Sequence, residues 1–225
     1  MGKIIKYLLL GLLMIGSTST MKSQEIKRPA IFQEITETIP SVVLEIRYFS
    51  KNNFIGSKIN GYKKAKAYLT KPAIEKLKKA AEEFKGKGFQ IKIFDAYRPQ
   101  RAVDHFVKWA NDKEDVLMKS AYYPDVSKKD LFKLDYIASK SGHSRGSTLD
   151  LTLVDAKTGK ELDMGSAYDF FGEISWPFAN NITKQQMKNR MLLRNIMLAN
   201  GFTPYKCEWW HFTLKNEPFP DTYFN

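Results

Sequence analysis

Apolar residues recur at helical spacing in four stretches of the chain. In the first stretch, Ile74, Leu77 and Phe84 share one face of a helix, and glycines follow it. The fourth stretch begins with Thr183 and Gln186 at the spacing of a capping box, in which each side chain bonds to the backbone of the other residue. The pattern predicts helices over residues 70–88, 100–112, 127–140 and 183–201.

Alternating apolar and polar residues predict strands between these helices. Phe89, Ile91 and Ile93 fall on one face of the first predicted strand. The predicted strands cover residues 89–94, 149–155 and 208–214. No repeat, low-complexity run or long Gly/Ser linker divides the chain. We therefore expect a single α+β domain, in which a small, mainly antiparallel sheet is flanked on one side by helices.

Residues 1–23 have the layout of an export signal peptide. Two lysines precede an apolar run over residues 7–15, and small polar residues follow it. The run is shorter than the about 20 apolar residues that span a bilayer, so we expect no stable membrane span after cleavage. We expect cleavage between Ser17 and Gln24, which would leave a mature catalytic domain over residues 24–225 in the periplasm or outside the cell. An uncleaved membrane anchor is the alternative.

Composition adds a charge imbalance to this picture. The 36 Lys and Arg residues outnumber the 24 Asp and Glu residues, for a formal net charge of +12. On an exported protein, a basic surface suits an anionic neighbour such as a cell-wall polymer. No arginine-rich tract or stacked aromatic motif favours nucleic acid as a partner. Cys207 is the single cysteine, so no disulfide can form within the chain, and stability must come from the core or from a metal.

Candidate metal chemistry lies in the segment SGHSRGSTLDLTLVD, residues 141–155. On one continuous helix, His143 and Asp150 would be about 10.5 Å apart along the axis, too far for one metal ion. Glycines break such a helix, and the alternating leucines place Asp150 on a strand, with its side chain opposite theirs. A turn after His143 can then bring the imidazole back to the carboxylate.

The third ligand must come from elsewhere in the chain. Of the two other histidines, His105 lies on the more polar side of a predicted helix, whereas His211 lies in the apolar, aromatic stretch EWWHF. His143, Asp150 and His211 would form the ligand pattern of a catalytic zinc, which keeps water as a fourth ligand and lowers the pKa of that water to about 7. A lone buried histidine is more often a core residue, so the argument depends on both motifs together.

Glu208 precedes His211 by three positions and is a candidate general base. A carboxylate beside the reacting water can take its proton and return it to the departing amine. Residues three apart in an extended strand face opposite sides, so this role requires Glu208 to lie just before the strand or in a bulge.

These motifs carry a family resemblance. SGHSRGSTLD resembles the signature S-x-H-x-x-G-x-A-x-D, and EWWH resembles E-x-x-H, of the VanX-type D-alanyl-D-alanine dipeptidases. These zinc peptidases are related to DD-carboxypeptidases and to the Hedgehog signalling domain. The similarity continues through DAYRPQRAVDHFVKWA and GFTPYKCEWWHFTL, and Thr148 replaces the alanine of the signature without changing a ligand position.

The resemblance implies a role for each matching residue. His143, Asp150 and His211 match the zinc ligands, and Glu208 matches the general base and acid. Arg98, in DAYRP, matches the arginine that stabilises the oxyanion of the tetrahedral intermediate. The alternative for this arginine is an ordinary surface ion pair with Asp95 or Asp104.

The resemblance also implies how the substrate is held. Tyr48 and Asp169 match positions that bind the free amino group of the dipeptide, with Ser141 placed to assist. The expected function is that of an exported zinc dipeptidase that hydrolyses D-alanyl-D-alanine in cell-wall turnover or precursor trimming. One alternative is a DD- or LD-carboxypeptidase acting on longer peptidoglycan stems, which a more open amino-end pocket would favour. Another is a zinc-stabilised binding module without turnover.

Overall fold

The structure, a computed structural model, describes residues 30–225. The predicted signal peptide over residues 1–23 and its cleavage region lie outside the described residues. Within the described part of the chain, no helix combines the length and the apolar character that a membrane crossing requires.

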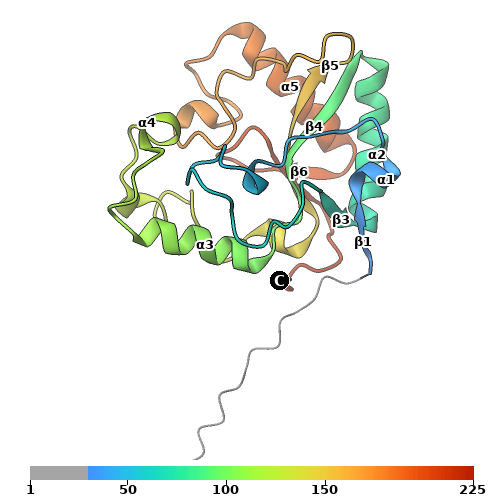
Figure 1. Ribbon diagram of the computed structural model, residues 1–225. Helices are drawn as coiled ribbons and strands as arrows, with labels where there is room; N and C mark the ends of the chain where they lie inside the picture. Colours follow the sequence, from blue (N-terminus) through green and yellow to red (C-terminus); the bar gives the residue numbers. More distant parts are fainter. Residues whose placement is uncertain (1–29) are drawn as a thin grey trace, which may run out of the picture.

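Two sheets form the β structure of residues 30–225 (Figure 1). A two-stranded antiparallel sheet pairs β1 (Phe32–Glu34) with β3 (Tyr68–Thr70). The main sheet has five strands in the order β2, β4, β5, β7, β6, with bounds Val43–Leu44, Phe89–Asp95, Thr148–Asp155, His211–Leu214 and Phe202–Pro204. Only the β2–β4 pair is parallel. The predicted α+β fold with a mainly antiparallel sheet is therefore confirmed. Strand β7 begins three residues later than the predicted strand over residues 208–214.

Three of the four predicted long helices are present. The α-helices are α1 (Ile35–Thr38), α2 (Lys71–Gly86), α3 (Gln100–Asn111), α4 (Lys119–Tyr122) and α5 (Lys184–Ala199). Short 3-10 helices are η1 (Arg47–Phe49), η2 (Lys128–Asp130), η3 (Gly142–Arg145) and η4 (Glu173–Ser175). The predicted capping box at the start of α5 is confirmed, because the Thr183 side chain accepts from the Gln186 backbone and the Gln186 side chain accepts from the Thr183 backbone.

The predicted helix over residues 127–140 is wrong. Only η2 forms there, and turns follow it. The Lys128 ammonium group is buried, and it donates to the backbone carbonyl oxygens of Trp109, Asp112 and Asp115 at 2.7, 2.6 and 2.6 Å. The segment therefore folds back onto the end of α3, where Lys128 satisfies backbone carbonyl groups. This tertiary contact outweighs the helical spacing of the segment's leucines.

The two faces of the main sheet are covered differently. α2 packs against β4 and α5 against β6, and these helices cover the face that carries the fully buried Leu149, Leu151 and Leu153. α3 lies on the other side, where the Phe106 ring is 5.0 Å from the ring of Tyr48. The prediction that every helix lies on one side of the main sheet is therefore wrong for α3. The face opposite α2 and α5 carries the polar residues of β5.

Candidate metal centre and catalytic site

A short turn brings His143 to the sheet. The Ser141 hydroxyl accepts a hydrogen bond from the His143 backbone at 3.3 Å and so caps η3. Gly146 ends this turn at φ +81°, a conformation that favours glycine, and an added Cβ would lie 2.3 Å from the Phe32 ring. The chain then enters β5, where Asp150 points away from the leucine face. The turn thus brings the His143 imidazole back to the Asp150 carboxylate, as the glycines in the sequence predicted.

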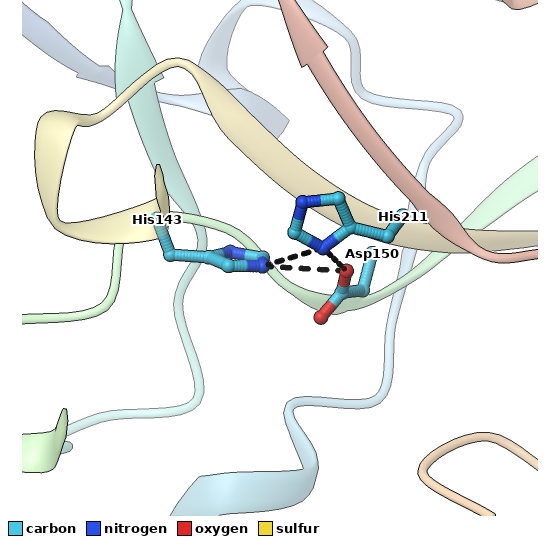
Figure 2. Close-up of side chains that lie close together, drawn as sticks. All are labelled: His143, Asp150 and His211. Atoms are coloured by element: carbon cyan, nitrogen blue, oxygen red, sulfur yellow. Dashed lines mark hydrogen bonds and ion pairs between the residues drawn. The ribbon is translucent and has the colours of Figure 1, made fainter. Parts of the chain in front are cut away.

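His211 completes the cluster from the neighbouring strand, since β5 and β7 pair Asp150 with His211 directly. The Asp150 Oδ1 atom lies 3.3 Å from His143 Nε2 and 3.1 Å from His211 Nδ1. The two ring nitrogens are 3.3 Å apart. Figure 2 shows the three side chains pointing toward one another. His105, by contrast, lies on α3 and accepts from the Asn60 backbone at 3.2 Å.

These three residues fit a metal ion. The Asp150 Oδ1 atom is buried and has no hydrogen-bond partner. The His143 Nδ1 atom donates to the Ala96 carbonyl oxygen at 2.7 Å, which leaves Nε2 as the unprotonated nitrogen that faces the cluster. Burial lowers the pKa of His143 and favours the neutral ring that binds metals. Because the unpartnered Asp150 Oδ1 atom and the unprotonated His143 Nε2 atom converge beside His211 Nδ1, a cation at their centre would satisfy these lone pairs.

Glu208 lies beside this cluster, just before the turn over residues 209–210 that leads into β7, as its proposed role requires. Its Oε2 atom is 3.4 Å from His211 Nδ1. Burial raises the pKa of the Glu208 carboxyl to about 7, against the opposing effect of the His211 charge. A carboxyl group with a pKa in this range can both accept and release a proton near neutral pH.

The guanidinium of Arg98 also lies next to the cluster, near Asp150. The register of β4 and β5 shifts between Ile93 and Asp95, and this irregularity pairs Asp95 with Asp150. Asp95 is buried, and its carboxylate accepts from Arg98 Nε at 2.8 Å and from the Tyr62 hydroxyl at 2.6 Å. The predicted alternative of an Arg98–aspartate pair is therefore also present, but it is buried rather than on the surface. The pair holds the guanidinium 3.5 Å from Asp150 Oδ2.

Two tyrosines connect Asp150 with Asp169. The Tyr48 hydroxyl donates to both carboxylate oxygens of Asp169, at 3.1 and 2.9 Å. The Tyr168 hydroxyl lies 2.9 Å from Asp150 Oδ2, to which it donates, and 3.1 Å from the Tyr48 hydroxyl. Burial raises the pKa of Asp169 well above its ordinary value, and the charge of Asp150 adds to the effect. Sequence reasoning missed Tyr168 and considered Asp95 only as a possible surface partner of Arg98, because neither residue stands in a metal or catalytic spacing pattern.

Two cavities meet at the cluster. The inner cavity has a volume of about 50 Å³ and is lined by Tyr48, Asp150 and Asp169 among others. The outer cavity has a volume of about 230 Å³, and Ser141 lies in its wall. Arg98, Glu208 and His211 line both cavities. The structure thus brings all eight predicted site residues to one place, while their individual roles stay predictions.

An α+β fold that gathers a buried His–Asp–His cluster, a carboxyl group and a guanidinium around a cavity is typical of metal-dependent hydrolases. Comparison with known proteins agrees. The sequence profile of the D-ala-D-ala dipeptidase family matches residues 29–225. The chain therefore belongs to the D-ala-D-ala dipeptidase family, whose members are metal-dependent peptidases.

Individual relatives cover most of the chain. A D-alanyl-D-alanine dipeptidase of Enterococcus faecalis is 41% identical over 86% of this chain and 96% of its own length. One of Streptomyces coelicolor is 40% identical with the same coverage. One of Escherichia coli is 33% identical over 80% of this chain and 83% of its own.

Proposed function

We propose that the protein is an exported zinc dipeptidase that hydrolyses D-alanyl-D-alanine to D-alanine, in cell-wall turnover or precursor trimming. The observation that carries the proposal is the convergence of His143, Asp150 and His211 next to the two cavities that Glu208, Arg98 and His211 line. Family membership and the dipeptidase relatives support the reaction class.

Zinc is the metal we assign to the cluster. Two imidazoles and one carboxylate, with a position left open, are a donor set that catalytic zinc uses in proteins. When bound, the ion would supply a Lewis acid for the peptide carbonyl and lower the pKa of water to about 7. His143, Asp150 and His211 would hold it.

The remaining steps belong to side chains of this chain. Glu208 would accept the proton of the attacking water and deliver it to the amine of the departing D-alanine. Arg98 would donate to the oxyanion that develops on the carbonyl oxygen, and its pair with Asp95 fixes the guanidinium before substrate arrives. Such preorganised donors each contribute about 100-fold or more to the rate.

The substrate's amino group would lie in the inner cavity. Asp169 would pair with the ammonium group, and Tyr48 would orient the Asp169 carboxylate. Ser141 lines only the outer cavity, so any contact it makes with the substrate would lie there rather than at the ammonium group. An incoming ammonium favours the ionised form of a buried carboxyl group, so substrate would offset the raised pKa of Asp169.

The size of the inner cavity favours a dipeptide over a longer stem. A stem peptide extends from the amino side of the terminal D-alanines, the side that the inner cavity would enclose. That cavity has about 50 Å³, far below the about 300–1,000 Å³ of sites for larger ligands. A carboxypeptidase acting on peptidoglycan stems would need an opening there.

A binding module without turnover would not need a base or an oxyanion donor. Glu208 and Arg98 both line the cavities, so the site supports an enzyme better than a binding module.

Export is supported by the apolar run over residues 7–15. The net charge of +12 supports an anionic cell-wall polymer as a neighbour.

The test is D-alanine release by the purified mature protein, with metal content measured, beside Glu208→Ala. We expect the variant to keep its metal and lose at least about 100-fold in turnover, because the proton acceptor is gone. Glu82→Ala, an exposed site on α2, is the matched control and should remain fully active. A fully active Glu208→Ala would remove the proposed mechanism. Sequencing the amino terminus of the secreted protein tests the cleavage between Ser17 and Gln24.

A further inference from the structure

A dipeptide carries two opposite charges, and the proposed site accounts for only one of them. The ammonium group has Asp169 in the inner cavity. An extended dipeptide spans about 7 Å, so its carboxylate cannot share a cavity of about 50 Å³ with its amine. The carboxylate must therefore lie in the outer cavity, where a cation in the wall would attract it.

The cations that line the two cavities, apart from the histidines of the cluster, are Arg98 and Lys140. The guanidinium of Arg98 is already held by Asp95 at 2.8 Å and lies 3.5 Å from Asp150. The guanidinium carbon of Arg98 lies 5.0 Å from the centre of the Tyr48 ring, and Arg98 lines both cavities. That position suits the peptide carbonyl between the two ends of the substrate.

Lys140 has the opposite properties. It lines the outer cavity only, next to Ser141, and its side chain is exposed. Its ammonium group lies 4.9 Å from the centre of the Tyr223 ring, a contact that orients the side chain without neutralising it. Over residues 30–225, no carboxylate forms an ion pair with it.

Two acidic groups also line the outer cavity, and neither one forms an ion pair with Lys140. Asp135 pairs with the Lys206 ammonium at 3.7 Å. Glu208 lies beside His211, with 3.4 Å between carboxylate oxygen and ring nitrogen. The ammonium of Lys140 therefore remains available to an anion that enters the outer cavity.

We propose that Lys140 binds the C-terminal carboxylate of the substrate and so fixes the direction in which a dipeptide lies: amine inward at Asp169, carboxylate outward at Lys140. This inference rests on the proposed dipeptidase activity and adds the residue that recognises a free C-terminus. Lys140 contacts the substrate at a distance from the reacting bond, so its contribution is to binding rather than to bond cleavage.

The experiment compares D-alanyl-D-alanine with its C-terminal amide, which lacks the negative charge, on the full mature enzyme. We expect Lys140→Gln to raise KM for the free acid about tenfold, the effect of losing one charge-assisted hydrogen bond, with kcat unchanged. Hydrolysis of the amide should change less than about twofold, because the amide does not use the charge. Lys140→Arg should retain most of the preference for the acid.

The control is Lys157→Gln, which removes the same charge from an exposed turn after β5 and should leave both substrates unaffected. If Lys140→Gln changes acid and amide equally, or changes neither, the carboxylate assignment is wrong while the dipeptidase stands. If the wild-type protein releases no D-alanine from the dipeptide, the proposed function and this inference both fail.

Discussion

Strand β5 presents leucines to one side of the sheet and polar side chains to the other. Leu149, Leu151 and Leu153 pack among other apolar residues of the core, and each is fully buried. On the other side, Asp150 is equally buried, but its Oδ1 atom has no hydrogen-bond partner, and the same holds for Thr152 Oγ1.

The two sides therefore contribute differently to the protein. Dispersion and the hydrophobic effect are non-directional, so leucine contacts are shared among many neighbours, and losing one weakens the fold without changing any chemistry. A buried polar atom needs a partner at a defined place, and an unsatisfied one costs stability. The polar side is thus shaped by the site it forms, at the expense of folding free energy.

The largest effect should come from Asp150→Asn. The amide removes the negative charge from between two imidazoles and brings a donor into a cluster of acceptors. We expect metal affinity to fall about 1,000-fold, equivalent to about 4 kcal/mol, and dipeptidase activity to fall with it. Metal affinity is measured by competition with a chelator, and unfolding of the metal-free variant shows whether the fold survives. Unchanged metal affinity would mean that Asp150 is not a ligand.

The matching change on the other side is Leu153→Ala. Leu153 is fully buried and pairs with Ile91 of β4. Truncation should lower the free energy of unfolding by about 3 kcal/mol, through lost burial and the cavity left behind. Metal affinity and kcat should stay within about twofold of wild type. Denaturant unfolding and the chelator competition together check the result, and a large loss of metal affinity would contradict the separation of the two sides.

Local patterns explain which parts of the fold could be predicted. The Thr183–Gln186 capping box and the alternation of leucines in β5 depend on residues close in the chain, and both are present. The helix over residues 127–140 was predicted from spacing of the same kind. It failed because Lys128 is bound by carbonyl groups 13 to 19 residues earlier, which no local pattern records.

The site could be predicted in its ligands but not in their support. His143, Asp150 and His211 were recognisable from residue type, from the break at the glycines and from the family resemblance. The partners that position them depend on tertiary contacts: Asp95 faces Asp150 through a register irregularity, and Tyr168 reaches it across 18 residues. An aspartate at the end of a strand and a tyrosine in a loop have no spacing that indicates these contacts.

A smaller effect should follow from Tyr168→Phe. The Tyr168 hydroxyl donates to Asp150 Oδ2 at 2.9 Å, while its ring stacks on Phe94 with centroids 4.6 Å apart. Phenylalanine keeps the stack and removes the bond that orients the carboxylate, so we expect metal affinity to fall about tenfold. Tyr123→Phe is the matched control, because that hydroxyl is buried without a hydrogen-bond partner. Equal metal affinity in both variants would show that Tyr168 does not position Asp150.

The smallest effect, and the only gain in stability, should come from Thr152→Val. Valine keeps the shape of threonine and removes a buried hydroxyl that has no partner, so the free energy of unfolding should rise by about 1 kcal/mol. Thr148→Val tests the opposite case on the same side of β5, because the Thr148 hydroxyl bonds to the Thr213 hydroxyl at 2.9 Å. That change should lower stability by about 1 kcal/mol, since it leaves Thr213 without this partner. Denaturant unfolding of the two metal-free variants measures both signs, and a stability loss in both would mean that the Thr152 hydroxyl is satisfied in solution.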